Sequence, residues 1–192
     1  MLASLANDKH VITEARMAMN SGEAREMLAA SKASPGLVAQ IVPAPHTLKV
    51  DAFIEGLIAD GYLGELLSID LTAHQGDFID YGSPVHWRHD RDLSGNNIMQ
   101  MGIWYEAMMR WIGPAASVMA VARVNVPARR DGAGVLRWIT IPDHVEILCE
   151  MATGPVARMR LSTVTGLAPE DGVWLFGTEG TLRLDTGSMT LR

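Results

Sequence analysis

Residues able to take part in acid–base chemistry and ligand binding gather in one polar stretch, His86-Trp87-Arg88-His89-Asp90. An imidazole can take a proton from a hydroxyl group near neutral pH. A guanidinium can hold a carboxylate or hydroxyl groups, and a flat indole beside it offers an apolar surface. We therefore predict that His86 acts as a base and that Trp87 and Arg88 bind substrate. In the alternative interpretation, Trp87 closes the core and Arg88 forms an ion pair with a neighbouring aspartate.

The other histidines carry weaker signals. His89 and His46 are further candidate bases, whereas His74 and His144 fall in strand patterns and are predicted to be structural. The histidines around Asp90 match no closed zinc pattern and no second ligand cluster follows, so no metal site is predicted.

A second group of candidate binding residues lies on a predicted helix, Asn96–Ile112. Asn96, Gln100 and Trp104 share one face by their four-residue spacing, and Asn97 lies beside them. Amides suit the hydroxyl groups of carbohydrates, and an aromatic ring suits the C–H face of a sugar. Asn97, Gln100 and Trp104 are therefore candidate substrate-binding residues. The alternative is a core helix, in which the indole packs inside and the amides cap the first turn.

Composition excludes several function classes. The 192 residues carry a net charge of −6 with scattered basic residues, which argues against nucleic acid as a partner. No apolar run reaches the ~18 residues of a membrane span, and no signal peptide is recognised, so we predict a cytoplasmic protein without a membrane partner. The single cysteine, Cys149, lies in an apolar stretch and is predicted to be a buried structural thiol.

The elements that position these residues begin with a strand–helix–strand pattern. Residues 1–7 resemble the end of a helix, and a strand at 9–13, a helix at 21–31 and a strand at 37–42 follow. This is the smallest piece of a parallel α/β sheet. Because three elements cannot bury both faces of such a sheet, we expect another part of a protein to cover it.

The rest of the chain predicts a helix, a long loop, a second helix and a sheet. A helix at 48–60 precedes a strand at 66–75, and the polar loop at 76–95 is long enough to favour a functional role. Turn residues then separate short strands, which indicates a largely antiparallel sheet. The predicted strands are 117–126, 136–141, 144–151, 156–164, 173–176, 181–184 and 189–192.

Four stretches in this order resemble one enzyme family. Residues 8–14 are similar to Gly-Lys-His-Val followed by Glu-Lys-Pro, and residues 60–66 to a Gly-x-Leu-Gly-x-Ile turn. Residues 86–102 are similar to Trp-Arg, Gly-Gly-Gly and Asp-x-Gly-x-His, and residues 175–182 to a Gly-Thr-Glu-Gly-x-Leu hairpin. The chain thus resembles the Gfo/Idh/MocA family of NAD(P)-dependent oxidoreductases over most of its length.

The resemblance implies an α/β (α+β) fold and two domains. We expect residues 1–45 to be the C-terminal remnant of a Rossmann-type dinucleotide-binding domain. Residues 46–192 are expected to form a substrate-binding and dimerisation domain, a large, mainly antiparallel sheet flanked by helices. The implied substrate is a sugar, cyclitol or related small polyol. The implied assembly is a homo-oligomer through the sheet, because apolar faces at 117–126 and 156–164 would need cover.

The resemblance also implies a cofactor and a set of catalytic residues. An intact member uses NAD or NADP, but no Gly-x-Gly-x-x-Gly occurs here, so none is expected to bind this chain alone. The family's Lys, Asp and His positions carry Ala15, Gln100 and Trp104. Glu14 keeps the family's identity and is predicted, with Arg16, to contact the cofactor. Arg16 follows the missing lysine and is also a candidate catalytic residue, or else an ion-pair partner of Glu14.

These substitutions leave two hypotheses about activity. An amide does not accept a proton at neutral pH and an indole only donates one hydrogen bond, so Gln100 and Trp104 do not replace the family's acid and base. Either a divergent oxidoreductase builds its proton relay from residues such as Arg16 and His86, or the chain is a non-catalytic ligand-binding or dimerisation module.

Overall fold

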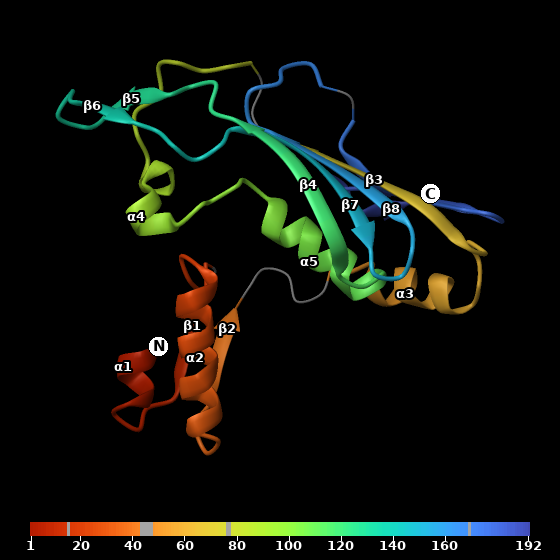
Figure 1. Ribbon diagram of the computed structural model, residues 1–192, viewed down its shortest axis with the longest axis horizontal. Coiled ribbons are helices and arrows are strands. Elements are labelled where there is room, and N and C mark those ends of the chain that lie inside the picture. The colour runs from red at the N-terminus through yellow and green to blue at the C-terminus, as the bar shows by residue number, and fades with distance from the viewer. Residues whose placement is uncertain (15, 43–47, 76–77, 169) are drawn as a thin grey trace. The chain divides into compact units, whose positions relative to one another are not determined.

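The computed structural model describes the chain from Met1 to Arg192 except residues 15, 43–47, 76–77 and 169 (Figure 1). The described residues form two compact units. Unit 1 combines those of Met1–His46 and His86–Asn97, and unit 2 those of Thr47–Val85 and Ile98–Arg192. Each unit has its own hydrogen-bonded elements, and the mixed α/β fold agrees with the predicted class.

Unit 1 contains the predicted strand–helix–strand pattern. Its elements are α1 (Leu2–Leu5), β1 (Val11–Glu14), α2 (Ser21–Ala33) and β2 (Ala39–Val42). The two strands pair in parallel from Val11 opposite Ala39 to Glu14 opposite Val42. Helix α2 starts where predicted because the Asn20 side chain accepts the N–H of Glu23 as its N-cap.

Unit 1 leaves apolar side chains on its surface. Ile12 of β1 is 67% exposed, Leu28 of α2 is 55% exposed, and α2 has no fully buried residue. Parallel sheets are normally covered on both faces. The prediction that these elements cannot bury such a sheet by themselves is therefore confirmed.

The segment predicted as a loop before residue 95 contains two helical turns, η1 (Trp87–His89) and α4 (Arg91–Ser94). Side chains start both: Nδ1 of His86 accepts the N–H of Arg88, and Asp90 accepts the N–H of Asp92. Turns this short have no apolar period, so their capping residues were the only signal in the sequence.

Unit 2 is built on a seven-stranded sheet with the order β11-β10-β9-β3-β8-β7-β4. Every neighbouring pair is antiparallel except β3 with β8. The predicted large, mainly antiparallel sheet is thus confirmed. The strands are β3 (Leu66–His74), β4 (Ala115–Arg123), β7 (His144–Met151), β8 (Val156–Ser162), β9 (Gly172–Gly177), β10 (Thr181–Asp185) and β11 (Thr190–Leu191). A separate hairpin pairs β5 (Ala128–Arg130) with β6 (Leu136–Trp138).

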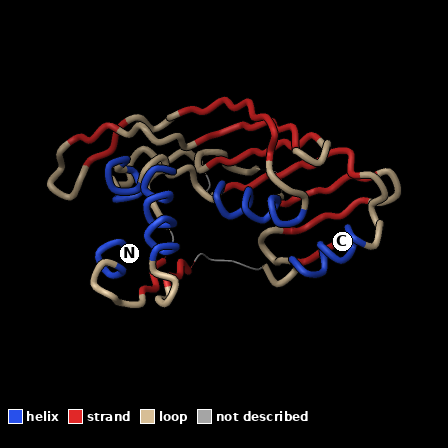
Figure 2. Tube along the Cα trace, turned by 60° about the horizontal axis from the view of Figure 1, so that its bottom comes forward, coloured by secondary structure: helices blue, strands red, loops and turns tan. Residues whose placement is uncertain are grey.

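Helices α3 (Asp51–Ala59) and α5 (Met101–Trp111) lie along one face of this sheet (Figure 2). Alternate strand residues point toward them, as the two-residue period of a strand requires. In β7 these include Ile147 and Cys149, which are 7% and 2% exposed. The core lies between the sheet and the helices, and the prediction that Cys149 is buried is confirmed.

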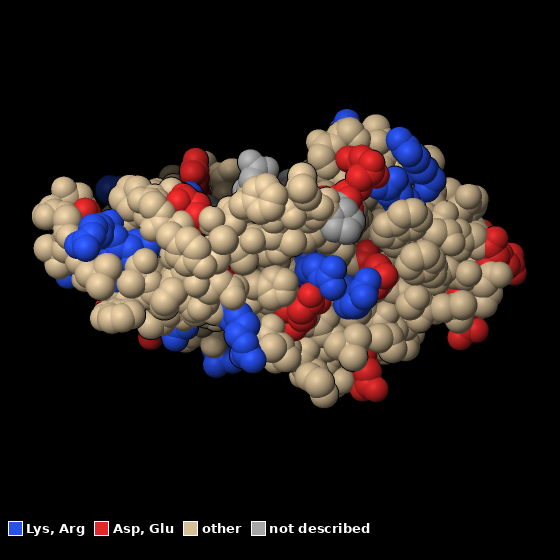
Figure 3. Space-filling model, turned by 90° about the horizontal axis from the view of Figure 1, so that it is seen from above, with Lys and Arg blue, Asp and Glu red and all other residues tan. Residues whose placement is uncertain are grey.

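The opposite face of the sheet is more polar than predicted. The outward positions of β8 include Arg158 and Arg160, which pair with Asp70 at 3.0 Å and with Glu146 at 2.6 Å. Figure 3 likewise shows basic and acidic side chains interspersed over the face that it draws. Strand β8 does have an apolar face, formed by Ala157, Met159 and Leu161, but this face is buried in the core. The prediction that it needs cover from a second copy is therefore wrong, since the outward positions are charged.

Exposed apolar residues concentrate instead on the edge strand β4. Val118, Met119 and Val121 are 61%, 72% and 54% exposed. Met119 lies opposite the exposed Leu148 and Val118 opposite the buried Cys149, so apolar side chains project from both faces of this strand. The edge of the sheet extends beyond the cover of its helices.

Helix α5 begins later than predicted, at Met101 rather than Asn96. Met99 has a left-handed backbone (φ 44°), which ends any helix that would run through it. Asn96 instead accepts a hydrogen bond from Arg91 at 2.9 Å. Asn97 therefore lies before the helix, and the predicted helical face of amides does not form. Among the described residues, no helix is long and apolar enough to cross a membrane.

Candidate functional site

The carboxyl ends of β1 and β2 carry the first group of predicted site residues. Glu14 ends β1 opposite Val42, the last residue of β2, and Arg16 follows shortly after. Ligands of open α/β sheets bind beyond the carboxyl ends of the strands. Glu14 and Arg16 thus occupy the edge of unit 1 that suits a ligand, whereas Ala15 and His46 lie outside the described residues.

Burial, and then the positive charge of Arg88, lower the pKa of Arg16 below its ordinary value. Neither arginine takes part in a salt bridge within the described part of the chain. The alternatives in which Arg88 pairs with an aspartate and Arg16 with Glu14 are not observed. Asp90 instead caps helix α4.

A glycine holds the segments of these arginines together. Gly95 has φ 62°, and a Cβ atom there would lie 2.2 Å from the backbone oxygen of Met19. Only a residue without a side chain allows this approach, so Gly95 fixes the turns around Arg88 against the chain that follows Arg16. The signal in the sequence was the Leu-Ser-Gly of the family-like stretch, but the glycine's partner was not predictable from it.

Trp87 holds the Arg88 guanidinium over its ring and is itself 47% exposed, so it does not close the core as the alternative interpretation expected. The guanidinium carbon of Arg88 lies 4.5 Å from the centroid of the Trp87 ring, a cation–π arrangement. The ring of His86 lies 5.7 Å from the same indole. The Arg88 carbonyl oxygen accepts hydrogen bonds from Ser94 at 3.0 Å and Asn97 at 3.5 Å. These contacts bring the predicted residues His86, Trp87, Arg88 and Asn97 together.

His86 has a structural role that limits its use as a base. Nδ1 of its ring accepts the backbone N–H of Arg88 at 3.3 Å. The backbone N–H of His86 donates to Nδ1 of His89 at 3.0 Å. The first bond places the proton of a neutral His86 on Nε2. Nδ1 is then the atom that can take a proton, and it must first release the Arg88 N–H.

Gln100 and Trp104 form the second group, in unit 2. The indole N–H of Trp104 donates to Oε1 of Gln100 at 3.1 Å. Trp104 is only 4% exposed and packs in the core with Ala107 and Met108. The indole N–H of Trp104 is thus satisfied within the protein, and the ring is part of the core. This geometry matches the core-helix alternative for Trp104.

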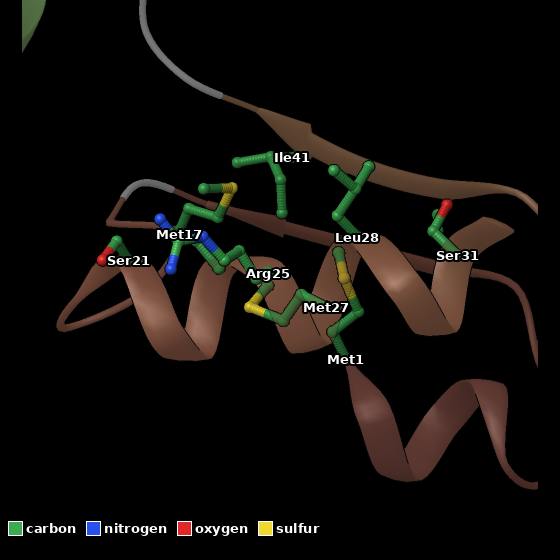
Figure 4. Close-up of a pocket in the computed structure, with 10 residues that line it drawn as sticks. Met1, Met17, Ser21, Arg25, Met27, Leu28, Ser31 and Ile41 are labelled. Atoms are coloured by element: carbon green, nitrogen blue, oxygen red, sulfur yellow. The ribbon is translucent and has the colours of Figure 1, made fainter.

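A cavity of about 400 Å³ lies in unit 1 between α2 and β2 (Figure 4). Its walls are mainly methionine and aliphatic side chains, while Arg25 lies beside Met17 at one end. Such a lining gives few partners to the hydroxyl groups of a sugar. The hollow belongs to the apolar surface that unit 1 leaves uncovered, and it contains none of the predicted site residues.

The residues present do not fit the pyrophosphate of a dinucleotide. That group usually binds where a glycine-rich turn leads into a helix and exposes its first N–H groups. Here residues 15–20 between β1 and α2 contain no glycine. Asn20 accepts the N–H of Glu23 at 3.0 Å, and the Glu23 carboxylate accepts the N–H of Met19 at 2.9 Å. The start of α2 is therefore occupied by its own side chains, one of them negatively charged.

No group of three or more His, Cys, Asp or Glu side chains within the described ranges could hold a metal ion.

Residues 53–183 match the model of the GFO/IDH/MocA C-terminal domain. The chain belongs to the Gfo/Idh/MocA family. The predicted resemblance of the chain to this family is thereby confirmed. No protein of curated function matches the sequence.

Solved structures of similar fold extend over nearly the whole chain. An NAD binding oxidoreductase from Klebsiella pneumoniae has a TM-score of 0.82 at 24% identity, covering 99% of this chain and 52% of its own. Levoglucosan dehydrogenase in complex with NADH and L-sorbose has a TM-score of 0.78 at 21% identity, covering 97% and 50%. A super-repressor mutant of Gal80p from Saccharomyces cerevisiae has a TM-score of 0.77 at 16% identity, covering 95% and 50%. The family member thus spans about half the length of these proteins, and at such identities the likeness shows the fold.

Proposed function

We propose that this chain is the substrate-binding and sheet-forming part of a Gfo/Idh/MocA-type oxidoreductase. The intact enzyme would transfer hydride between NAD(P) and a sugar, cyclitol or related small polyol. The family match over residues 53–183 carries this proposal. The fold shared with an NAD binding oxidoreductase and with levoglucosan dehydrogenase supports it.

The proposed domains follow the predicted boundaries. Residues 1–45 belong to the end of a Rossmann-type domain and residues 46–192 form the substrate-binding and dimerisation domain. The 192 residues lack the glycine-rich loop, and the start of α2 is closed by Asn20 and Glu23. Hydride transfer therefore requires a dinucleotide-binding part besides these residues. Glu14 and Arg16, at the carboxyl end of β1, would border the cofactor.

The polar residues around Arg88 are the proposed substrate contacts of unit 1, and Gln100 is a separate proposed contact of unit 2. Oxidation of an alcohol releases a hydroxyl proton that a base must accept. Because Ala15, Gln100 and Trp104 replace the family's acid–base groups, we assign this role to His86, whose Nδ1 can accept a proton once it releases its hydrogen bond.

One observation favours a second candidate function, a non-catalytic ligand-binding module. Trp104 stands at the family's histidine position, is buried, and has its N–H satisfied by Gln100. The same fold occurs in Gal80p, which is described as a repressor mutant. The fold therefore does not by itself require catalysis.

The test is an assay of the native protein isolated from its source cells. A panel of sugars and cyclitols with NAD and NADP is followed by the absorbance of the reduced nicotinamide. Substrate-dependent reduction supports the oxidoreductase, and loss of kcat in His86→Asn supports the assigned base. Saturable sugar binding without reduction supports the second function instead. If the native protein neither binds nor oxidises any of these compounds, both functions are wrong.

A further inference from the structure

The cavity of unit 1 is an apolar groove that carries a cation at one end. It has a volume of about 400 Å³ and is bounded by helix α2, strand β2 and the first residue of the chain. Leu28 of α2 and Ile41 of β2 point into the space between these two elements (Figure 4). Met1, Met17 and Met27 complete the apolar lining. Methionine side chains are flexible and polarisable, so such walls adapt to the shape of an apolar guest.

The charge of the groove comes from Arg25. Among the described residues that line it, Arg25 is the one with a charged side chain, and its guanidinium lies toward the end of Met17 and Ser21 (Figure 4). No carboxylate of the described chain forms an ion pair with Arg25. The nearby Glu23 carboxylate accepts the N–H of Met19 instead. An acidic group of a ligand would therefore meet a cation that has no competing partner.

The size and lining of the groove favour an alkyl chain over other guests. Apolar cavities of about 150 Å³ hold benzene, so a hollow of about 400 Å³ has room for a chain of roughly eight to twelve carbons. Each methylene that leaves water strengthens binding by up to about fourfold. Sugars and dinucleotides would instead lose the hydration of their hydroxyl and phosphate groups against methionine and aliphatic side chains.

We propose that this groove binds a medium-chain fatty acid. The alkyl chain lies between α2 and β2, and the carboxylate lies at Arg25, where a guanidinium fork matches its two oxygens. None of the predicted substrate or cofactor contacts lines the groove. The site is thus a second binding function, for amphipathic carboxylates, and it does not rest on the proposed oxidoreductase.

Calorimetric titration of the 192-residue protein with octanoate, decanoate and dodecanoate, each below its micelle concentration, tests this site. Decyltrimethylammonium is the charge control, since it joins a ten-carbon chain to a cationic head group. Physiological ionic strength screens the protein's net charge of −6. We expect one decanoate per chain, about two- to fourfold tighter binding per added methylene, and at least about threefold weaker binding of the cation.

Variants locate the ligand in the groove. Leu28→Gln places an amide in the apolar wall and Ala24→Leu fills part of the hollow, so each should weaken decanoate binding at least about fivefold. Arg25→Gln should weaken decanoate binding about three- to fivefold and leave decyltrimethylammonium unchanged. The matched controls are Ala29→Gln and Lys32→Gln, at exposed positions of the same helix outside the groove, and both should bind as the wild type does.

Several results would overturn the proposal. They are no saturable binding of any fatty acid, affinity that does not depend on chain length, equal binding of the cation, and equal losses in the control variants. The Arg25→Gln result does not depend on stability, because both head groups are compared on one variant, and an unchanged preference for decanoate would refute the site. If the fatty acids do not bind, and Leu28→Gln but not Ala29→Gln turns an associating protein into a monomer in sedimentation, the groove is a protein interface instead.

Discussion

The structural role of Asp51 is visible only in the folded protein. Its carboxylate is buried, yet it accepts hydrogen bonds from the Leu48 backbone, from Arg110 and from the Trp111 indole. The sequence predicted the apolar stripe of helix α3. It also predicted that Arg88 lies in an exposed polar stretch. That an acid at the start of α3 is buried depends on donors from α5, and no local pattern contains that information.

We predict that Asp51→Ala lowers the free energy of unfolding by about 3 kcal/mol, because it leaves the partly buried Arg110 guanidinium and the buried Trp111 indole N–H without their acceptor. Denaturant unfolding followed by circular dichroism measures the change. Asp60→Ala, at an exposed carboxylate just beyond the same helix, should change it by less than about 0.5 kcal/mol. Equal effects of the two variants would show that Asp51 does not join the helices.

The thiol of Cys149 should be unreactive toward disulfide reagents in the folded protein. Burial raises the pKa of its thiol, so the thiolate that reacts with disulfide reagents is suppressed in the native state. The raised pKa also means that this group's contribution to stability is lost as pH rises above the ordinary thiol value. Reaction with a chromogenic disulfide should therefore be slow at pH 8 and become fast on unfolding. Immediate reaction of the native protein would contradict the buried position.

At the scale of elements, local periodicity predicted most strands and helices but not their partners. Strand β7 was predicted with its observed bounds, because alternation and flanking turns both mark it. The parallel pairing of β3 with β8 was not predictable, since it joins strands far apart in sequence. Helix α5 was predicted to begin five residues too early, because the left-handed backbone of Met99 leaves no mark in composition.

The β5–β6 hairpin offers a prediction about pH. Hydrogen bonds from Arg137 and then from the Val135 backbone lower the pKa of Asp131. A carboxylate with a lowered folded pKa stabilises above its unfolded value, about 3.9, and loses that contribution as pH falls through the folded value. Carboxyl carbon shifts should thus show Asp131 titrating below the ordinary aspartate value, and Arg137→Gln should raise its pKa. An unchanged pKa in that variant would contradict the assigned cause.

At the scale of the whole molecule, two surfaces remain apolar: the elements of unit 1 and the edge strand β4. The first was predictable, because a strand–helix–strand pattern has too few elements to cover a parallel sheet. The second was only half predictable. Both β4 and β8 were expected to have an apolar face that a second copy of the chain covers. In β8, however, ion pairs occupy the outward positions.

We predict that the protein self-associates through the sheet, with β4 at the centre of the interface. Met119→Lys combined with Val121→Lys should shift micromolar protein toward the monomer in sedimentation velocity, because it places like charges without partners in the interface. Leu167→Lys is the control, since this leucine is 92% exposed on another segment. Wild-type protein that sediments as a monomer, or a variant that associates as before, would contradict the proposed interface.

We propose that these 192 residues carry the substrate side of an oxidoreductase and do not bind the dinucleotide by themselves. The most direct test is a fluorescence titration of the 192-residue protein with NADH. The start of α2, closed by Asn20 and Glu23, predicts no saturable binding at micromolar NADH. Micromolar affinity for NADH would contradict the claim and would require a pyrophosphate site other than a glycine-rich turn.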